Sequence, residues 1–279
     1  MSQRHQIVAE HFDEAARYWN DIYQYTDVYS LIYQERRAAI RDMIQRLRLP
    51  AGARVLEVGC GAGHTAIEIA EMGYQVEAVD CSSSMIETTL ANARQAGVAG
   101  RVRARQADIY TLDAPAEGFH LVVAIGVLPW LDSIKNPVQS LARAAAPGGH
   151  VITTVDHRWG WNRVLDPRVN PLILGAKTVA RRTLEIAGLR QTVARARTHS
   201  TGELDRALLA AGLQKQEGLT LGFGPFTFWN RNLLSDERGV ALHKRLQARA
   251  NAGQAPYKWG GAQYIVCAQK NHRRNSHAN

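Results

Sequence analysis

The chain has 279 residues, and 46% of them are hydrophobic, which is enough to bury the core of one large domain. Its formal net charge of +9 fits an acidic substrate, a membrane surface, nucleic acid or solubility alone. No apolar run of about eighteen residues occurs and no apolar signal segment stands at the start, which predicts a cytoplasmic protein without stable membrane insertion.

The spacing of the cysteines and histidines argues against a disulfide framework and against a metal site. Cys60, Cys81 and Cys267 lie far apart and form no CxxC pair, and the ten histidines include no HxxxH or HExxH pattern. Disulfide scaffolds and zinc sites use such residues at short, regular spacing. The sequence therefore predicts neither a disulfide framework nor a metal site.

Residues 1–49 precede the first predicted strand and have the periodicity of two helices. Most of the chain's tyrosines lie in this segment. Aromatic residues at such spacings usually pack between helices. The alternative, which gives the segment a function, is a helical lid from which Tyr23 and Tyr33 face a ligand.

Residues 50–156 alternate short apolar runs with helix-like segments. The predicted strands are RVLEVG, QVEAVD, RVRARQAD, FHLVVAIGVL and HVITTV. Strands that alternate with helices pair in parallel, and their crossover helices cover both faces of the sheet. The expected fold class is α/β with a doubly wound sheet, and residues 50–156 form its ligand-binding core.

The alternation stops at residue 157 and resumes at residue 199. Residues 157–198 are rich in arginine and predict a helical insertion that caps the substrate. Its 172–197 stretch has a modest apolar stripe, so contact with a lipid surface stays open, although we expect weak or no binding to vesicles. Residues 199–270 would complete the core, and residues 271–279 have the polar composition of a disordered tail.

Three glycines follow the first predicted strand, in the stretch VLEVGCGAG. Gly59, Gly61 and Gly63 predict a tight turn in which bare backbone and the amides of the next helix meet a ligand. A dinucleotide-binding turn would place its third glycine one position later, where this chain has His64. The spacing therefore argues against NAD.

EVGCGAG resembles the first motif of class I S-adenosylmethionine-dependent methyltransferases, in which an acidic residue precedes GxGxG. The resemblance continues through QVEAVD, which ends in Asp80, RVRARQAD, which ends in Asp108, and the segment LARAAAPGGHVITTV. It covers residues 50–155 and implies a mostly parallel, seven-stranded, Rossmann-like sheet. Residues 213–224 and 261–269 would supply its last two strands.

The resemblance also implies S-adenosyl-L-methionine as cofactor. Glu57 would order the glycine loop and meet the methionine amino group, Asp80 would accept hydrogen bonds from the ribose hydroxyls, and Asp108 would meet the adenine amino group. The expected cofactor-binding residues are Glu57, Gly59, Cys60, Gly61, Gly63, Asp80, Cys81, Met85, Asp108, Ile109, Ile125 and Gly126.

A sulfonium methyl group is already electrophilic, so the enzyme mainly aligns an acceptor for in-line displacement and excludes water. If a base is needed, the candidates are His157, which directly follows the fifth strand, His199 and Tyr23. The expected substrate-binding residues are Trp159, Trp161, Arg163 and Tyr33. Each of these residues also has a purely structural interpretation, in backbone hydrogen bonding or in packing of the insertion.

These features predict an enzyme that methylates a small molecule, most simply at oxygen, with nitrogen and carbon acceptors left open. One alternative is an RNA or protein methyltransferase that uses the basic insertion, although no appended RNA-binding motif occurs and no nucleic-acid partner is expected. Another is a non-catalytic scaffold that retains the cofactor-binding fold. We expect a monomer or a homodimer.

Overall fold

One extended sheet forms the centre of the structure, a computed structural model that describes residues 3–112, 117–174, 196–229 and 231–271. Its strands are β1 (Arg54–Val58), β2 (Gln75–Asp80), β3 (Val102–Gln106), β4 (Phe119–Ala124), β5 (Ala145–His157), β6 (Thr198–His199), β7 (Leu213–Leu221) and β10 (Gln263–Lys270). A separate hairpin pairs β8 (Thr227–Phe228) with β9 (Arg231–Asn232). The described helices are α1 (Gln3–Glu14), α2 (Ala16–Asp21), α3 (Val28–Leu47), α4 (His64–Glu71), α5 (Ser83–Gln95), α6 (Lys135–Ala144), α7 (Trp161–Val164), α9 (Thr201–Ala210) and α10 (Asp236–Asn251).

The strand order is β3-β2-β1-β4-β5-β10-β7, and the two-residue strand β6 adds to β5. Strands β1 to β5 pair in parallel, whereas β10 runs antiparallel to both β5 and β7. This topology confirms the predicted mostly parallel, seven-stranded α/β fold. Because the order reverses between β1 and β4, a crevice forms outside the carboxyl ends of these strands.

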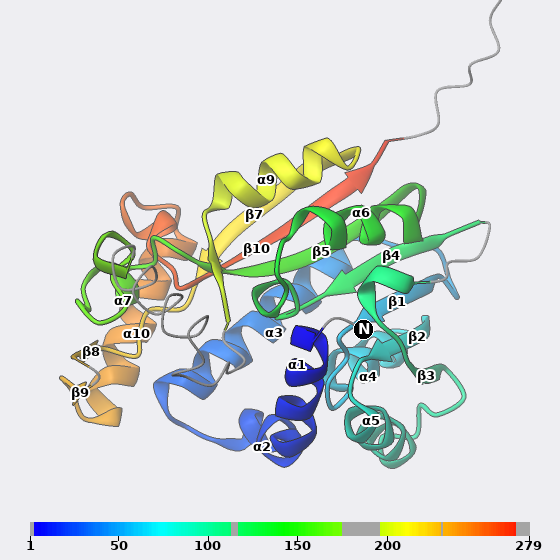
Figure 1. Ribbon diagram of the computed structural model, residues 1–279, viewed down its shortest axis with the longest axis horizontal. Coiled ribbons are helices and arrows are strands. Elements are labelled where there is room, and N and C mark those ends of the chain that lie inside the picture. The colour runs from blue at the N-terminus through cyan, green and yellow to red at the C-terminus, as the bar shows by residue number, and fades with distance from the viewer. Residues whose placement is uncertain (1–2, 113–116, 175–195, 230, 272–279) are drawn as a thin grey trace, which may run out of the picture.

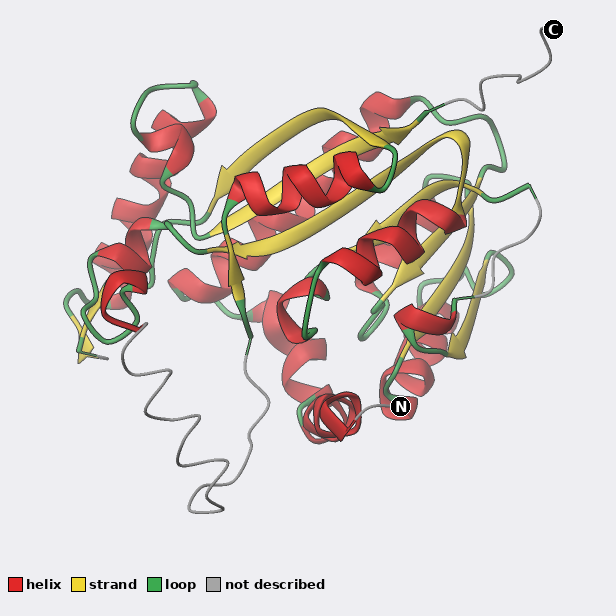
Figure 2. Cartoon of the chain, turned by 45° about the horizontal axis from the view of Figure 1, so that its top comes forward, coloured by secondary structure: helices red, strands yellow, loops and turns green. Residues whose placement is uncertain are grey.

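Helices cover both faces of the sheet, as Figures 1 and 2 show. Alternating strand residues divide the core into two clusters, since successive side chains of a strand point to opposite faces. Leu56 and Val122 pack with α6 and α9 on one face. Val55 and Leu121 pack with α3 and α4 on the other face.

Two element boundaries differ from the sequence prediction. Helix α6 ends at Ala144, and Pro147 and the two glycines after it lie inside β5 rather than before the predicted strand HVITTV. There β4 and β5 change register, from Phe119 opposite Ala145 to Leu121 opposite His150. From residue 3 onward the N-terminal segment contains three α-helices rather than two helices. Asp27 caps α3 by accepting hydrogen bonds from the backbone amides of Tyr29 and Ser30.

The N-terminal helices α1 and α2 lie against α5, at the carboxyl edge of the sheet. The Asp13 carboxylate accepts hydrogen bonds from the hydroxyls of Ser82 and Ser84. The Asn20 side-chain oxygen accepts a hydrogen bond of 2.8 Å from Asn92. These polar contacts hold the N-terminal helices over the crevice.

Some predictions fall on residues outside the described ranges. Of the predicted insertion, the structure describes residues 157–174 and 196–198, so most of the expected 172–197 helix lies outside the described residues. The predicted tail also lies outside them from residue 272 onward. Over the described residues, no helix combines the length and the apolar content needed to cross a bilayer.

Gly63 offers a test of how closely α4 and α5 pack. Its φ is +82°, and a Cβ at this position would lie 2.7 Å from Thr89 Cγ2. Gly73 also has a positive φ, +95°, but a Cβ there would meet no atom within 4 Å. We expect Gly73→Ala to lower the free energy of unfolding by about 1–2 kcal/mol through backbone strain alone, and Gly63→Ala to lower it by at least about 1 kcal/mol more. Urea unfolding measures both values, and equal losses would contradict the packing argument.

Candidate functional site

A pocket of about 380 Å³ opens at the carboxyl edge of the parallel strands, under the N-terminal helices. Its walls come from the loop after β1, the ends of β2, β4 and β5, the turn after β3, and helices α1 to α3. Convergence of so many segments follows from the parallel arrangement, which brings all these strand ends to one edge. A mostly apolar cavity with a few convergent polar groups is the usual form of a small-molecule site.

The loop after β1 folds back onto β2. The backbone amides of Gly59 and Cys60 donate to the carbonyl oxygen of Val79, at 2.7 and 3.1 Å. Gly61 has a φ of +54°, and a Cβ on it would meet no atom within 4 Å. Its backbone therefore faces open space in the pocket, where a ligand can approach it directly.

Glu57 stands at the base of the pocket with 3% of its surface exposed. Burial raises the pKa of its carboxyl group to about 8, against an ordinary value of 4.5, although hydrogen bonds from Ala66 and Thr65 act in the opposite direction. Within the described residues, its buried Oε2 atom has no hydrogen-bond partner. A ligand that brings a cationic hydrogen-bond donor to this oxygen would satisfy it.

Two further carboxylates lie at the neighbouring strand ends. Asp80 Oδ2 accepts a hydrogen bond from the Gly61 amide and Oδ1 accepts one from the Ser82 amide, both at 2.9 Å. Burial raises the pKa of Asp80, while these two amides oppose the increase. Asp108 accepts a hydrogen bond of 3.0 Å from the Tyr110 amide. Since each carboxylate oxygen has two lone-pair positions, Asp80 can accept further hydrogen bonds from a ligand while it shapes the loop.

A buried arginine, which the sequence analysis missed, joins these carboxylates in the pocket lining. Arg36 lies on α3 with 8% of its surface exposed, and its guanidinium carbon sits 4.3 Å from the centre of the Tyr33 ring. A Cβ on Gly126 would lie 3.5 Å from Arg36 Nη1. In the part of the chain that the structure describes, Arg36 forms no ion pair, so its charge is available to an anionic ligand group.

Aromatic side chains form another part of the pocket lining. Phe12 lies 5.0 Å from Trp130 and 6.0 Å from Trp19, measured between ring centres. The hydroxyls of Tyr29 and Tyr33 are 2.8 Å apart and hydrogen bonded. All five side chains line the cavity, and together they make a surface suitable for a flat, largely apolar molecule.

The structure brings the expected cofactor-binding residues together, with one exception. Eleven of the twelve line the pocket: Glu57, Gly59, Cys60, Gly61, Asp80, Cys81, Met85, Asp108, Ile109, Ile125 and Gly126. Gly63 does not line it. Its missing side chain instead leaves room for Thr89 on α5.

Of the three candidate bases, Tyr23 lines the pocket and the two histidines do not. The ring of Tyr23 makes an edge contact with His64, at 4.9 Å between ring centres. His157 is buried, and its Nδ1 atom lies 3.0 Å from the Gly261 carbonyl oxygen. Burial lowers the pKa of His157. This placement agrees with the alternative that His157 is a structural residue bonded to backbone.

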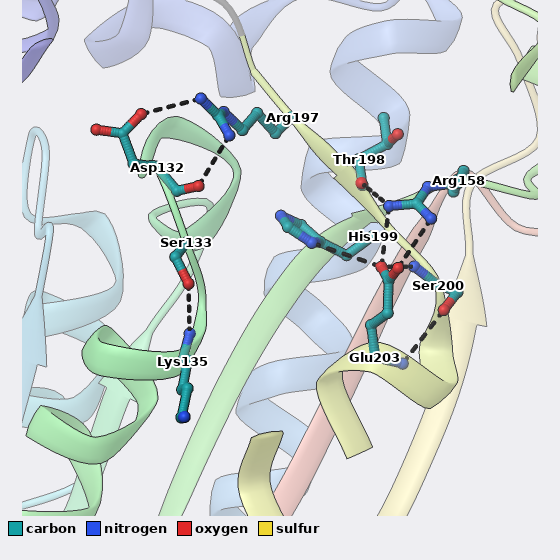
Figure 3. A network of polar contacts seen from close by, with 9 residues as sticks. All are labelled: Asp132, Ser133, Lys135, Arg158, Arg197, Thr198, His199, Ser200 and Glu203. Carbon is teal, nitrogen blue, oxygen red and sulfur yellow. Dashed lines mark hydrogen bonds and ion pairs between the residues drawn. The ribbon is translucent and has the colours of Figure 1, made fainter. Parts of the chain in front are cut away.

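His199 belongs to a separate polar network, shown in Figure 3. Its Nδ1 atom lies 3.7 Å from Glu203, whose carboxylate also binds Arg158 through two hydrogen bonds of 2.8 and 3.0 Å and closes a capping box with Ser200. Nearby, Arg197 donates to the Asp132 carboxylate at 2.9 Å. The network fastens the chain between the insertion and α9 to the core, so His199 serves there rather than in the pocket.

Among the expected substrate-binding residues, only Tyr33 lines the pocket. Trp161 packs against Phe223 and Tyr257 at ring-centre distances of 5.7 and 5.4 Å, and Trp159 is 44% exposed. Arg163 donates to the Asp156 carboxylate at 3.4 Å. Trp161 therefore pins the start of the insertion, Trp159 is largely exposed, and Arg163 reaches the pocket only through Asp156.

The matching family model and the following two relatives are methyltransferases. The family described as "Methyltransferase domain" matches residues 33–217, more than half of the chain. Ubiquinone biosynthesis O-methyltransferase of Chelativorans sp. (strain BNC1) is 28% identical over 201 residues, which are 71% of this chain and 74% of that protein. Trans-aconitate 2-methyltransferase of Azoarcus sp. (strain BH72) is 35% identical over 115 residues, 41% of this chain and 44% of that protein. The chain thus spans less than half the length of the second relative.

Solved structures give the same result for the fold. The crystal structure of magnesium protoporphyrin IX methyltransferase from Synechocystis PCC 6803 with bound SAH superimposes with a TM-score of 0.63. The match covers 96% of this chain and all of that one, at 16% sequence identity. At this identity the likeness concerns the fold.

The raised pKa of Glu57 leads to a test on the free protein. The unfolded carboxyl ionises near pH 4.5 and the folded one near pH 8, so folding takes up a proton between these values and the free energy of unfolding falls as the pH rises through this window. The amide in Glu57→Gln does not titrate. We therefore expect the free energy of unfolding of this variant to fall by about 2 kcal/mol less than that of the wild type between pH 6 and pH 8. Urea unfolding at several pH values measures this difference. Parallel curves for the two proteins would contradict the assignment.

Proposed function

This chain belongs to the methyltransferase domain family, and from that premise we propose that it transfers a methyl group from S-adenosylmethionine to an oxygen atom of a small molecule. The observation that carries the proposal is one pocket that combines charged groups with aromatic side chains. The buried residues Glu57, Asp80 and Arg36 and the half-buried Asp108 line it together with the aromatic side chains described above. Such a pocket fits a polar methyl donor next to a flat acceptor.

The charged groups fit the amino-acid portion of the methyl donor. A cationic amino group would satisfy the unpartnered Oε2 atom of Glu57, and a carboxylate would neutralise the buried Arg36 guanidinium. Gly126 lies beside Arg36, and it leaves space that a side chain would fill. We therefore assign the methionine portion to the space between Glu57, Arg36 and Gly126.

The nucleoside portion is assigned to the two following strand ends. Asp80 would accept hydrogen bonds from the ribose hydroxyls through the lone pairs that Gly61 and Ser82 do not use. Asp108 and Ile109 would meet the adenine ring. When bound, S-adenosylmethionine supplies an electrophilic methyl group on a positively charged sulfur atom.

The aromatic part of the pocket, which we assign to the acceptor, fits a small molecule rather than a macromolecule. Phe12 and Trp19 lie on the N-terminal helices, and Asp13 and Asn20 bind these helices to α5. We propose that the N-terminal helices act as a lid that excludes water while the acceptor lies in line with the methyl group. The relatives with O-methyltransferase names favour oxygen as the acceptor atom.

Calorimetry tests the proposed function directly. We expect the purified chain to bind S-adenosylhomocysteine and not NAD, and Asp80→Ala to weaken that binding by about 1–3 kcal/mol because ribose hydrogen bonds are lost. Glu77→Ala is the control, since Glu77 lies on the same strand but pairs with Arg105 outside the pocket. Tight binding of NAD, or no binding of S-adenosylhomocysteine, would refute the proposal.

A second titration tests the assignment of Arg36. We expect Arg36→Gln to weaken S-adenosylhomocysteine binding by about 10- to 100-fold, since a charge-assisted pair is worth roughly 1.5–3 kcal/mol. Binding of 5′-methylthioadenosine, which has no amino-acid portion, should stay unchanged. Arg37→Gln is the control, because Arg37 pairs with Glu68 at 2.9 Å and does not line the pocket. An equal loss for both ligands would place Arg36 elsewhere in the site.

A further inference from the structure

One carboxylate of the pocket has no role in the assignment above. Asp156 lies near the end of β5 and lines the cavity. A quarter of its side chain is accessible, and this surface faces the cavity. Arg163 donates to Oδ2 at 3.4 Å, whereas within the described residues Oδ1 accepts no hydrogen bond.

Strand geometry places Asp156 in the pocket and its neighbour outside it. Successive side chains of β5 point to opposite sides, so Asp156 shares a side with Thr154 while His157 faces away. Thr154 Oγ1 accepts a hydrogen bond of 2.8 Å from the Gly126 amide. Two residues of strand span about 7 Å, so Asp156 stands one pleat beyond the point where we assign the methionine portion. An acceptor between Asp156 and the methyl group would fit this spacing.

The electrostatic neighbours of Asp156 are two arginines and two tyrosines. The charged groups that face it are Arg163 on α7 and Arg36 on α3, and the Tyr29 and Tyr33 hydroxyls also lie near it on α3. Burial raises the pKa of Asp156, and the two arginines act in the opposite direction. The Tyr33 pKa is raised well above 10, mainly by burial, so this tyrosine is a neutral hydrogen-bond donor rather than a base.

We propose, on the basis of the proposed function, that Asp156 is the catalytic base and that the acceptor is a phenolic hydroxyl on a flat, largely apolar molecule. The ring lies among Phe12, Trp19 and Trp130, and its hydroxyl donates a hydrogen bond to Asp156 Oδ1. Arg163 is a positioning residue, because it holds the other oxygen of the same carboxylate.

The step balances without a further reactant. The phenolic oxygen forms a bond to the methyl carbon as the carbon–sulfur bond breaks, and the electron pair of that bond stays on sulfur, which becomes neutral. The phenolic proton passes to Asp156, which later releases it to solvent. The products are a methyl ether, a thioether and one proton.

The charge of Asp156 also selects against another class of oxygen acceptor. A carboxylate needs no base, but it would place its negative charge against Asp156 in a poorly hydrated cavity. A neutral phenol gains a hydrogen bond at the same position. The structure therefore favours methyl ethers over methyl esters as products.

The test compares 2-naphthol with 2-naphthoate, flat molecules of similar size that differ in the acceptor group, and includes 1-naphthol and catechol as further phenols. Transfer of labelled methyl groups is measured for the wild type, Asp156→Asn and the control Asp42→Asn, which changes an exposed carboxylate of α3. We expect the phenols to be methylated and 2-naphthoate not. Asp156→Asn should lower kcat/KM for 2-naphthol by about 100-fold or more, with no change for the control.

Three further readouts separate catalysis from folding and cofactor binding. Asp156→Asn should keep the wild-type affinity for S-adenosylhomocysteine, measured by calorimetry, and for 2-naphthol, measured by tryptophan fluorescence, within about threefold. The wild-type rate should fall as the pH drops through the Asp156 pKa, because only the carboxylate accepts the proton. Arg163→Gln should move this fall to higher pH, since a nearby positive charge is lost.

The outcomes are distinguishable. Unchanged transfer in Asp156→Asn, faster methylation of 2-naphthoate than of 2-naphthol, or no methylation of any phenol by a protein that binds S-adenosylhomocysteine would overturn the role of Asp156. Failure to bind S-adenosylhomocysteine at all would instead overturn the proposed function.

Discussion

The free-energy cost of burying charge at one edge of the sheet governs this site. Parallel strands end at a common edge, and there Glu57, Asp80 and Arg36 are each less than a tenth exposed. Water cannot solvate these groups fully, so their charged forms are destabilised unless a partner compensates. A ligand with complementary charges and hydroxyls supplies the missing partners. The same burial that perturbs the pKa of Glu57 and Asp80 therefore makes the pocket selective for a polar, zwitterionic methyl donor.

The residues of the proposed cofactor site could be predicted to lie together because they follow strands in short, continuous stretches of sequence. The glycine loop, Asp80 and Asp108 each lie where an apolar run ends, and a parallel sheet brings such points together. The same reasoning cannot separate ligand contact from helix packing. Gly63 has a positive φ, as Gly61 does, yet a Cβ on Gly63 would meet Thr89, and Gly63 does not line the pocket.

The proposed acceptor site was less predictable because it depends on which way single side chains turn. Arg36 and Arg37 are adjacent on α3, but Arg37 pairs with Glu68 while Arg36 is buried in the pocket. On β5 the prediction chose His157 as a candidate base, whereas Asp156 faces the cavity. A shift of one residue exchanges the two faces of a strand, and helical periodicity alone does not decide between neighbours.

Ser82 connects the proposed cofactor site with the N-terminal helices. Its amide donates to Asp80, its hydroxyl accepts from the Met85 amide as the cap of α5, and the same hydroxyl donates to Asp13. The position of the proposed lid therefore depends on the loop that shapes Asp80. The proposed lid carries Phe12 and Trp19. The position of these two aromatic side chains therefore depends on the contact between Asp13 and Ser82, next to the proposed cofactor site.

Two carboxylate–arginine pairs differ in geometry, and the difference explains why one is structural and the other is suited to the proposed chemistry. Glu203 receives two short hydrogen bonds from Arg158 and one from the Ser200 amide, so both of its oxygens are occupied. Asp156 receives a single contact of 3.4 Å from Arg163, on the oxygen opposite the one available to a ligand. A bidentate partner would hold the carboxylate as a weak proton acceptor, whereas a single distant one fixes its orientation and leaves it basic. Because Asp156 shares its cavity with aromatic side chains, the proton donor that fits there is a hydroxyl group on a flat ring.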